Sequence, residues 1–364
     1  MFPFLFGLSL TAVCDRVFHA AAIASALLVF PALIFLGWFD AAVGSIVPLV
    51  MLAVILATLE YTDPDYAGVP ATGGLAGKTA LVVGGTRGIG LGVTRAFLRQ
   101  GARVVTAHHR TPPAPELAAE LAALGNFAGS VAVDLGLPES VASFSARLAA
   151  ESKVGEEAAF DVVVINSGVF CVHGVSAAGF ENTVNINTLG LVQLTQQLLP
   201  RLAPDATVIY SSSASSRNWK GSLEELLDVR SPLTEQFPLA DVRCLMLYAR
   251  SKALLNAIVI KNATGSSGVR FLAAFPNPTH TDMLIDGMAQ VAAALHYPTF
   301  FAPGSRAFDA FNLFWVRALT RSVDRVAAQY VFGAVTPTLP SGCLYFKETC
   351  LQPMPYEVQA STRV

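Results

Sequence analysis

A tyrosine and a lysine four residues apart are the first residues of this chain that could do chemistry together. Tyr248 and Lys252 lie in the segment YARSK, and residues four apart share one face of a helix. A free phenol, with a pKa of about 10, exchanges protons poorly at neutral pH. An ammonium beside it favours the phenolate, so the spacing predicts a lowered pKa for Tyr248 and proton exchange with a substrate oxygen.

A glycine-rich turn follows the first β-branched run, over residues 84–90 with the sequence GGTRGIG. Glycines at positions 84, 88 and 90 allow a tight turn, a close approach of the backbone to a pyrophosphate, and close packing of the next helix on the strand. The helix N-terminus adds N–H donors for phosphate oxygens. The turn therefore predicts a dinucleotide site, and the residues expected to contact the cofactor are Gly84, Thr86, Arg87, Gly88, Ile89 and Gly90.

The end of the second predicted strand indicates which dinucleotide binds. An acidic residue there would bind the ribose 2′-hydroxyl of NAD(H), whereas a cation would bind the 2′-phosphate of NADP(H). This chain has His108, His109 and Arg110 at that place, and Arg87 lies within the glycine turn. His109, Arg110 and Arg87 therefore favour NADP(H). The alternative is that Arg110 is only a solvated loop charge.

Short β-branched runs alternate with longer helical stretches from residue 79 onward. This alternation predicts an α/β fold with a doubly wound parallel sheet, a Rossmann fold, in one domain. The glycine turn then lies between the first strand and the first helix of that domain, as a dinucleotide site requires. The strands are predicted at residues 79–83, 103–107, 131–133, 161–165, 207–210 and 269–274.

The first sixty residues contain only four of the chain's 24 Lys plus Arg and 26 Asp plus Glu. The uncharged stretches 17–37 and 41–59 each have close to the ~20 residues that cross a bilayer as a helix, which predicts a transmembrane helical hairpin. A cleaved signal peptide, or one span with a re-entrant segment, is the alternative. The predicted organisation is a membrane anchor at 1–61, a linker at 62–77, a catalytic domain at 78–354 and a C-terminal tail at 355–364.

The overall composition excludes several classes of protein. Apolar residues make up 53% of the chain and charged residues 14%, so extensive disorder is not expected. The formal net charge of −2 provides no basic surface for nucleic acid, and no nucleic-acid partner is expected. The five cysteines are widely separated and lack C-x-x-C spacing, so we predict reduced thiols and no metal site.

Further motifs follow one another along the same domain. Residues 131–135 read VAVDL, 166–168 read NSG, 187–190 read NTLG, and Pro276 and Thr281 come after the YARSK segment. Together with the G-x-x-x-G-x-G turn, these motifs resemble the short-chain dehydrogenase/reductase family over about residues 77–353. The departures from the family pattern are Val83 before the first glycine, Ser167 in the N-A-G turn and Asn277 after Pro276, and none of them removes a catalytic group.

The resemblance implies a set of catalytic residues. By the family's mechanism, Tyr248 is the general acid/base, Lys252 also holds the nicotinamide ribose, and Asn187 supports a water that relays protons. A serine after the fifth strand would bind the substrate oxygen, and in the run SSSASS at 211–216 we prefer Ser213 to Ser212. The implied cofactor contacts beyond the glycine turn and the cations are Asp134, Leu135, Asn166, Tyr248, Lys252 and Thr281.

The substrate is indicated by what surrounds these residues. The chain between Ser213 and Tyr248 carries an insert, and retinol dehydrogenases and 3-ketosteroid reductases of the family have one at this place. Such an insert can wall a pocket. Residues 139–144 and 341–346 also look similar to the retinol group, and region 283–316 is rich in apolar side chains where the family builds a substrate lid. These features favour a lipophilic substrate, namely a retinoid, a steroid or a long-chain lipid.

The sequence therefore predicts a membrane-anchored NADP(H)-dependent oxidoreductase that interconverts an alcohol and a ketone or aldehyde by hydride transfer. One alternative is a non-catalytic NADP(H)-binding membrane protein that senses redox state for a partner, and another is a light-driven tetrapyrrole reductase. The expected partners are a small lipophilic substrate, the lipid bilayer and, by analogy with the family, a second copy in a homodimer. The expected location is the endoplasmic reticulum membrane, with the catalytic domain facing the cytosol.

Overall fold

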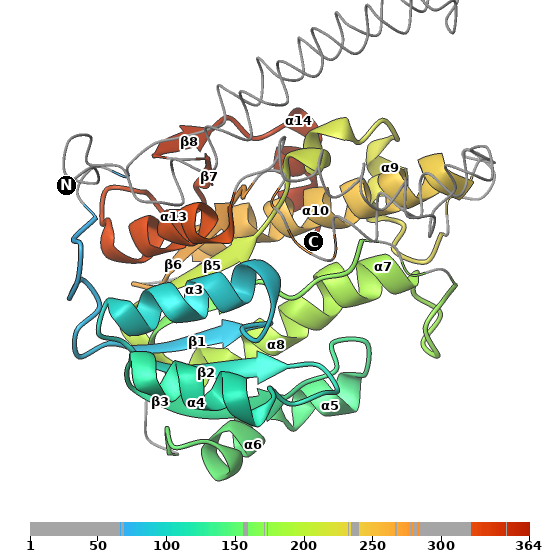
Figure 1. The fold of residues 1–364 in the computed structure, drawn as a ribbon. Helices are drawn as coiled ribbons and strands as arrows, with labels where there is room; N and C mark the ends of the chain where they lie inside the picture. Colours follow the sequence, from blue (N-terminus) through green and yellow to red (C-terminus); the bar gives the residue numbers. More distant parts are fainter. Residues whose placement is uncertain are drawn as a thin grey trace, which may run out of the picture.

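The computed structural model describes most of the predicted catalytic domain (Figure 1). The described residues are 66, 69–155, 159–170, 172, 174–231, 233, 240–265, 268–276, 279, 281, 283, 322–346 and 348–364. The predicted transmembrane stretches, Asn277 and nearly all of region 283–316 lie outside them. Among the described residues, no helix combines the length and the apolar character needed to cross a membrane.

Strands and helices alternate along the chain, as the sequence predicts. The elements are β1 (Thr79–Val83), α3 (Gly88–Arg99), β2 (Arg103–His108), α4 (Pro115–Leu124), β3 (Phe127–Ala132), α5 (Pro138–Ala142), α6 (Phe144–Glu151), β4 (Phe160–Ile165), α7 (Asn182–Val184), the π-helix η2 (Asn185–Leu189), α8 (Gly190–Leu198), the 3₁₀ helix η3 (Leu199–Arg201), β5 (Leu202–Ser211), the 3₁₀ helix η4 (Ala214–Asn218), α9 (Leu223–Leu227), α10 (Ala240–Gly265), β6 (Arg270–Ala274), α13 (Val323–Val335), β7 (Leu344–Phe346), β8 (Thr349–Leu351) and α14 (Pro355–Ser361).

The strands form one eight-stranded sheet in the order β3-β2-β1-β4-β5-β6-β7-β8. Neighbouring strands are parallel from β3 through to β7, and β8 is antiparallel to β7. The six predicted strands correspond to β1 through β6. The chain runs outward from β1 to β3 and then crosses back to β4, so the strand order reverses between β1 and β4. Ligands of open α/β sheets bind at such a reversal, and the predicted Rossmann-type fold is confirmed.

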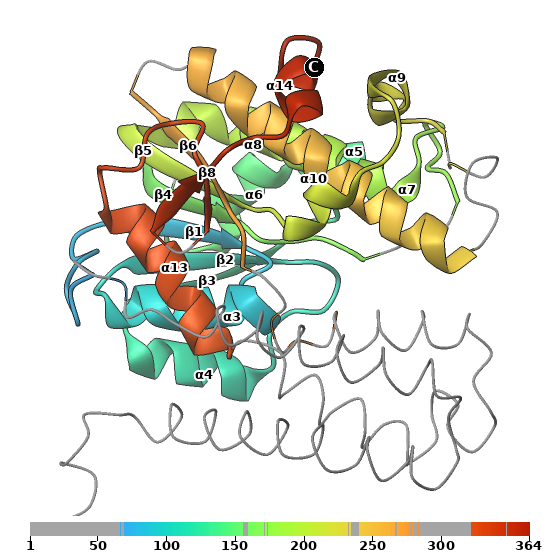
Figure 2. The ribbon, with the colours of Figure 1, turned by 90° about the horizontal axis from the view of Figure 1, so that it is seen from above.

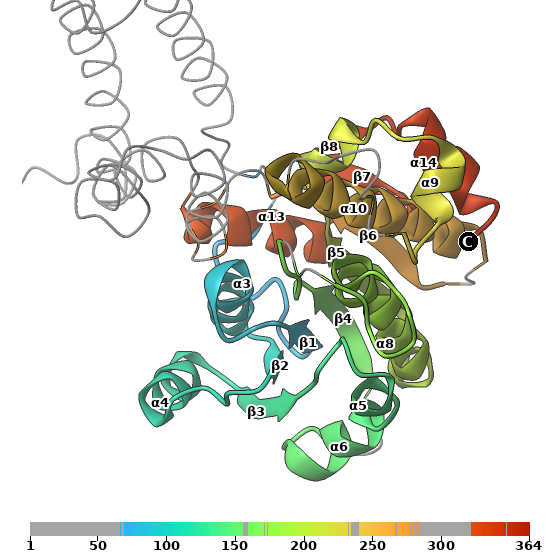
Figure 3. The ribbon, with the colours of Figure 1, turned by 90° about the vertical axis from the view of Figure 1, so that its right-hand side faces the viewer.

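Helices cover both faces of the sheet (Figure 3). α3, α4 and α13 pack on one face, where Phe97 and Tyr330 join a cluster with Val82 of β1. α5, α6, α8 and α10 pack on the other face, where Leu194 joins a cluster with Leu81 of the same strand. Since both faces of the parallel strands are buried, β1 is a continuous apolar run rather than an alternating one.

The β7–β8 hairpin carries a feature that the sequence analysis missed. A disulfide joins Cys343 and Cys350, whose Cα atoms are 5.5 Å apart, and Cys244 is disulfide-bonded as well. The prediction of reduced thiols is therefore wrong for these three cysteines. The hairpin turns the chain back on itself, which brings two cysteines seven residues apart within bonding distance although they form no recognisable sequence motif.

The segment expected to be a C-terminal tail contains α14, which packs against α10 and α9 (Figure 2). Pro355 occupies the first turn of this helix, where a missing N–H costs nothing. Glu357 and Ala360 are three residues apart and are both buried, so one face of the helix points into the domain. Residues 355–361 are thus part of the folded domain, which the predicted boundary at residue 354 did not anticipate.

Candidate active site

The glycine turn has the backbone that the predicted cofactor site requires. Gly84 and Gly88 have φ angles of +79° and +52°, which L side chains rarely adopt. A Cβ atom on Gly84 would lie 2.6 Å from Ser167 Oγ, and one on Gly90 would lie 2.0 Å from the Gly84 carbonyl oxygen. Helix α3 therefore begins against the turn at a distance that only glycine permits.

Gly90→Ala is expected to weaken NADPH binding by roughly tenfold or more, because the turn must move to admit the added methyl group. Fluorescence titration of the purified protein with NADPH measures this change. Gly265→Ala is the matched control, since a Cβ atom there meets nothing within 4 Å. An unchanged affinity in Gly90→Ala would show that the turn is not the cofactor site.

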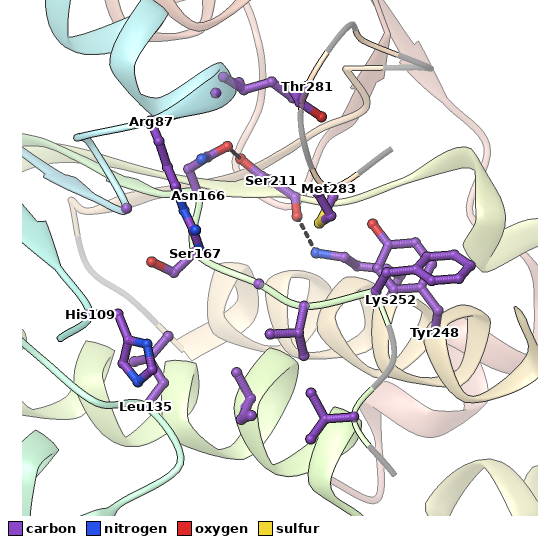
Figure 4. A pocket seen from close by; sticks show the side chains of 18 of the residues that line it. Arg87, His109, Leu135, Asn166, Ser167, Ser211, Tyr248, Lys252, Thr281 and Met283 are labelled. Carbon is purple, nitrogen blue, oxygen red and sulfur yellow. Dashed lines mark hydrogen bonds between the residues drawn. The ribbon is translucent and has the colours of Figure 1, made fainter. Parts of the chain in front are cut away.

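A cavity of about 370 Å³ opens at the carboxyl ends of the strands, beside the glycine turn (Figure 4). The predicted residues that line it are Gly84, Arg87, Gly88, Ile89, His109, Asp134, Leu135, Asn166, Tyr248, Lys252 and Thr281. Five other predicted residues, Thr86, Gly90, Arg110, Asn187 and Ser213, do not line it. The structure thus gathers most of the predicted cofactor residues, from positions 84 to 281, around one cavity.

One end of the cavity is basic, where Arg87 and His109 both contribute to the lining (Figure 4). His109 Nε2 lies 3.0 Å from Asp134 Oδ2, and Arg110 Nη2 lies 3.6 Å from the same oxygen. Burial favours a higher pKa for Asp134, but hydrogen bonds from His109 and from the Gly136 N–H, together with the Arg110 charge, hold the pKa below its ordinary value. Asp134 is therefore a carboxylate that pairs with the side chains of His109 and Arg110.

Tyr248 and Lys252 lie at the other end, on adjacent turns of α10 (Figure 4). Lys252 Nζ donates a hydrogen bond to the Ser211 carbonyl oxygen at 2.8 Å and lies 5.6 Å from the centre of the Tyr248 ring. The side chain of Ser213 is hydrogen-bonded to Tyr248. The end of β5 therefore contacts both members of the Tyr–Lys pair.

Burial dominates the pKa values of this pair. It raises the pKa of Tyr248 to about 12, although the hydrogen bond from Ser213 opposes the shift, and it lowers the pKa of Lys252 to about 8. The Tyr–Lys spacing predicted the opposite direction for the pKa of Tyr248. The expectation was wrong for this structure because both groups have lost water, which disfavours the phenolate and the ammonium alike. Tyr248 is consequently a protonated phenol at neutral pH.

The structure separates the two candidate serines. Ser212 is buried, and its hydroxyl donates to Asn256 Oδ1 at 2.6 Å. The Ser213 side chain is bonded to Tyr248 and also accepts the Ser215 N–H at 3.1 Å, which caps helix η4. Ser213 therefore adjoins the phenol but does not line the cavity, whereas Ser212 lines it, so the preference for Ser213 stays a prediction.

Asn187 lies in the π-helix η2 between α7 and α8. Its side-chain amide accepts the Val169 N–H at 2.8 Å and donates to the Val169 carbonyl oxygen at 2.8 Å. A Cβ atom on Gly168 would lie 3.1 Å from Asn187 Oδ1 and 3.7 Å from Lys252 Nζ, so the two side chains flank Gly168. Asn187 therefore fixes the chain after β4 beside the lysine.

Apolar residues that the sequence analysis did not single out also line the cavity. They are Val133, Val169, Phe170, Val172 and Ile186, and the ring of Phe170 lies 5.4 Å from that of Tyr248. Met283 lines it too, from the start of the apolar region predicted as a substrate lid. The described part of the insert instead forms η4, α9 and the start of α10, and none of its described residues lines the cavity.

Comparison with known proteins agrees with the motifs. Residues 78–222 match the family model for short chain dehydrogenase. The chain is 34% identical over 149 residues to oxidoreductase UcpA of Escherichia coli, which covers 39% of this chain and 54% of that protein. It is 32% identical over 178 residues to retinol dehydrogenase 12 of Mus musculus, which covers 46% and 55%. The chain spans about half the length of the curated relatives it matches.

A solved structure extends the likeness in fold. An uncharacterized protein of Mycobacterium paratuberculosis shares 21% identity with this chain at a TM-score of 0.54, covering 83% of this chain and 94% of that one. At this identity the likeness concerns the fold alone. The match over residues 78–222 agrees with the family that the sequence motifs resemble.

Proposed function

Because residues 78–222 match the short chain dehydrogenase family model, we propose that this chain is a member of the short-chain dehydrogenase/reductase family and an NADP(H)-dependent oxidoreductase that interconverts an alcohol and a ketone or aldehyde on a lipophilic substrate. One observation carries the proposal. A protonated Tyr248, with Lys252 and Ser213 beside it, lies at one end of a cavity whose other end is the glycine turn. This places a proton donor and a dinucleotide cradle in reach of one small molecule.

The residues present fit a nicotinamide dinucleotide. The turn around Gly84 and Gly90 leaves no room for a Cβ atom, which is typical of a backbone that approaches a pyrophosphate. Arg87 lies at the N-terminus of α3, where the helix dipole also favours anions. Arg87 and the pair His109 and Arg110 would hold the adenosine end, and Lys252 the nicotinamide ribose. The bound cofactor supplies the hydride for reduction or accepts it for oxidation.

The chain's own residues then handle the proton. A substrate alkoxide is a much stronger base than a phenolate, so Tyr248 gives its proton to the oxygen that forms when a carbonyl is reduced. The Ser213 hydroxyl, beside the phenol, would orient that same oxygen. Lys252 lies close enough to stabilise the phenolate left behind, and Asn187, across Gly168 from Lys252, holds the neighbouring loop in place.

Arg87→Ala and Arg110→Ala are each expected to weaken NADPH binding about tenfold and to leave NADH binding unchanged, because only NADPH carries the 2′-phosphate. Titration of each variant with both cofactors measures the difference. Arg99→Ala, at the exposed far end of α3, is the matched control. A wild-type protein that prefers NADH would show that these cations do not select the cofactor.

Several observations support a lipophilic substrate. Phe170, Val172, Ile186 and Met283 line the cavity with apolar surface, and the Phe170 ring lies against Tyr248, which suits an apolar ligand with one polar group. Two relatives are named retinol dehydrogenases. The uncharged stretches near the N-terminus, which we propose anchor the chain in a membrane, would bring the domain close to lipid.

The disulfide bears on which side of the membrane the catalytic domain faces. Disulfides form and persist in oxidising compartments, so the Cys343–Cys350 bond favours the lumenal side of the endoplasmic reticulum over the cytosolic side that the sequence analysis expected. We propose a membrane anchor with a lumenal catalytic domain. The homodimer stays a prediction.

The experiment is an assay of NADPH oxidation by the detergent-solubilised full chain, with retinal, steroid ketones, 3-keto sphingoid bases and long-chain aldehydes as substrates. The proposal expects turnover of one of these classes. Tight NADPH binding with no turnover of any class would favour the alternative, a redox-sensing binding protein.

A further inference from the structure

A buried carboxylate lies behind the candidate catalytic residues, on the C-terminal helix. Glu357 is only 1% exposed, although the next residue on α14, Val358, is 45% exposed. Glu357 Oε2 accepts the Met354 N–H at 2.8 Å, and Oε1 accepts from Asn256 Nδ2 at 2.7 Å. A buried carboxylate is costly unless such hydrogen bonds compensate it, so its partners indicate what it stabilises.

The main partner, Asn256, belongs to the same helix face as the Tyr–Lys pair. Tyr248, Lys252 and Asn256 are spaced four residues apart on α10, so their side chains form one stripe. Asn256 is fully buried and uses every polar atom of its side chain. Its Nδ2 donates to Glu357 and, at 3.1 Å, to Ser216 Oγ, while its Oδ1 accepts from Ser212.

These bonds hold the segment between β5 and η4 at several points. Ser212 is held through Asn256, and the Ser216 carbonyl oxygen accepts the Tyr356 hydroxyl of α14 at 2.6 Å. The residues on either side of Ser212 are those that contact the Tyr–Lys pair, since Lys252 bonds to the Ser211 carbonyl and the Ser213 side chain bonds to Tyr248. The position of this short segment therefore sets the position of both contacts.

We propose that Glu357 is a positioning residue, which acts through Asn256 and Ser212 to hold Ser213 and the Ser211 carbonyl against the Tyr–Lys pair. The inference rests on the proposed function, because it assigns a role in the same reaction. Helix α14 thus supports the active-site residues although, among the described residues, none of its side chains lines the cavity.

The test compares Glu357→Ala with Glu357→Gln. The Ala variant removes the acceptor for Asn256, so kcat is expected to fall on the order of 10- to 100-fold while KM for NADPH stays within about twofold. The Gln variant keeps an oxygen that can accept from Asn256 but places an amide against the Met354 N–H. It is expected to lose thermal stability and to keep kcat within about threefold of wild type. Val358→Ala, at the exposed neighbouring position, is the matched control.

Hydrogen exchange of the peptide covering residues 211–218 is measured on the same variants without substrate. Glu357→Ala is expected to speed exchange there by about fivefold or more, and Val358→Ala to leave it unchanged. This result decides the inference even if the wild-type chain turns over no substrate, which would instead overturn the proposed function. If Glu357→Ala does not fold, Tyr356→Phe removes one bond to the same segment and is expected to speed exchange about twofold.

Two results would overturn the inference. One is a folded Glu357→Ala variant with wild-type kcat and wild-type exchange at residues 211–218. The other is a kcat that falls in step with thermal stability in both Glu357 variants, which would assign Glu357 a role in folding only.

Discussion

Tyr248→Phe is expected to lower kcat by about 100- to 10,000-fold, the usual contribution of a general acid, and to leave NADPH binding within about twofold. The change removes only the hydroxyl that Ser213 contacts. The ring stays against Phe170 and near Lys252, so the walls of the cavity are kept. Steady-state turnover gives the first quantity, and NADPH fluorescence titration gives the second.

Tyr210→Phe is the matched control for this variant. Tyr210 is a fully buried tyrosine that does not line the cavity, and its hydroxyl lies 2.6 Å from Thr195 Oγ1. Its loss is expected to cost stability of about 1 kcal/mol and to leave kcat unchanged. If Tyr248→Phe kept more than about a tenth of wild-type turnover, the proton donor would have to be another group.

Lys252→Met is expected to abolish measurable turnover and, at pH 7, to stabilise the fold. Burial lowers the pKa of Lys252 from 10.5 to about 8, so the folded protein carries a desolvated ammonium whose cost is about 3 kcal/mol. Methionine fills a similar volume without that charge. The substitution also removes the hydrogen bond to the Ser211 carbonyl oxygen, which destabilises the fold by about 1 kcal/mol or more. The free energy of unfolding is therefore expected to rise by a net amount of about 1–2 kcal/mol.

The stability difference between wild type and Lys252→Met is expected to change with pH. The cost is fully present below pH 8, where the lysine is charged in both the folded and the unfolded chain. Between pH 8 and 10.5 the folded protein releases the proton while the unfolded chain keeps it, so wild-type stability rises relative to Lys252→Met by about 3 kcal/mol. Urea unfolding of both proteins at pH 7 and pH 10.5 measures the change, and Lys220→Met, at an exposed site, is the control. A stability difference that does not vary with pH would mean that Lys252 is not desolvated in the folded protein.

The sequence predicted those parts of the fold that depend on the pattern of neighbouring residues along the chain. Strands β1, β2, β4 and β6 and the second half of β5 are almost wholly buried, so each contains a short, mostly apolar run that stands out between helices. The hairpin of β7 and β8 was missed because its strands have three residues each, too few for any period to appear. The C-terminal helix was missed as well, since it has only seven residues, of which Glu357 and Ala360 alone are buried.

The candidate site divides in the same way. The glycine turn and the Tyr248–Lys252 spacing are local, and the structure places them as the sequence predicts. The hydrogen-bond network from Glu357 through Asn256 to Ser212 joins residues more than a hundred positions apart, so no local spacing in the sequence predicts it. The direction of the Tyr248 pKa shift was also out of reach, because it depends on how much water the fold removes rather than on which residues are neighbours.

The most direct test of the account follows the hydride itself. NADPH carrying deuterium at the transferable C4 position is incubated with the purified full chain and the best carbonyl substrate of the panel, and the product is analysed by mass spectrometry. We expect an alcohol with one deuterium on the former carbonyl carbon, formed by wild type and Tyr210→Phe at similar rates and by Tyr248→Phe at least about 100-fold more slowly. Saturable NADPH binding with no deuterium transferred to any substrate would contradict it and would leave a cofactor-binding protein in place of an oxidoreductase.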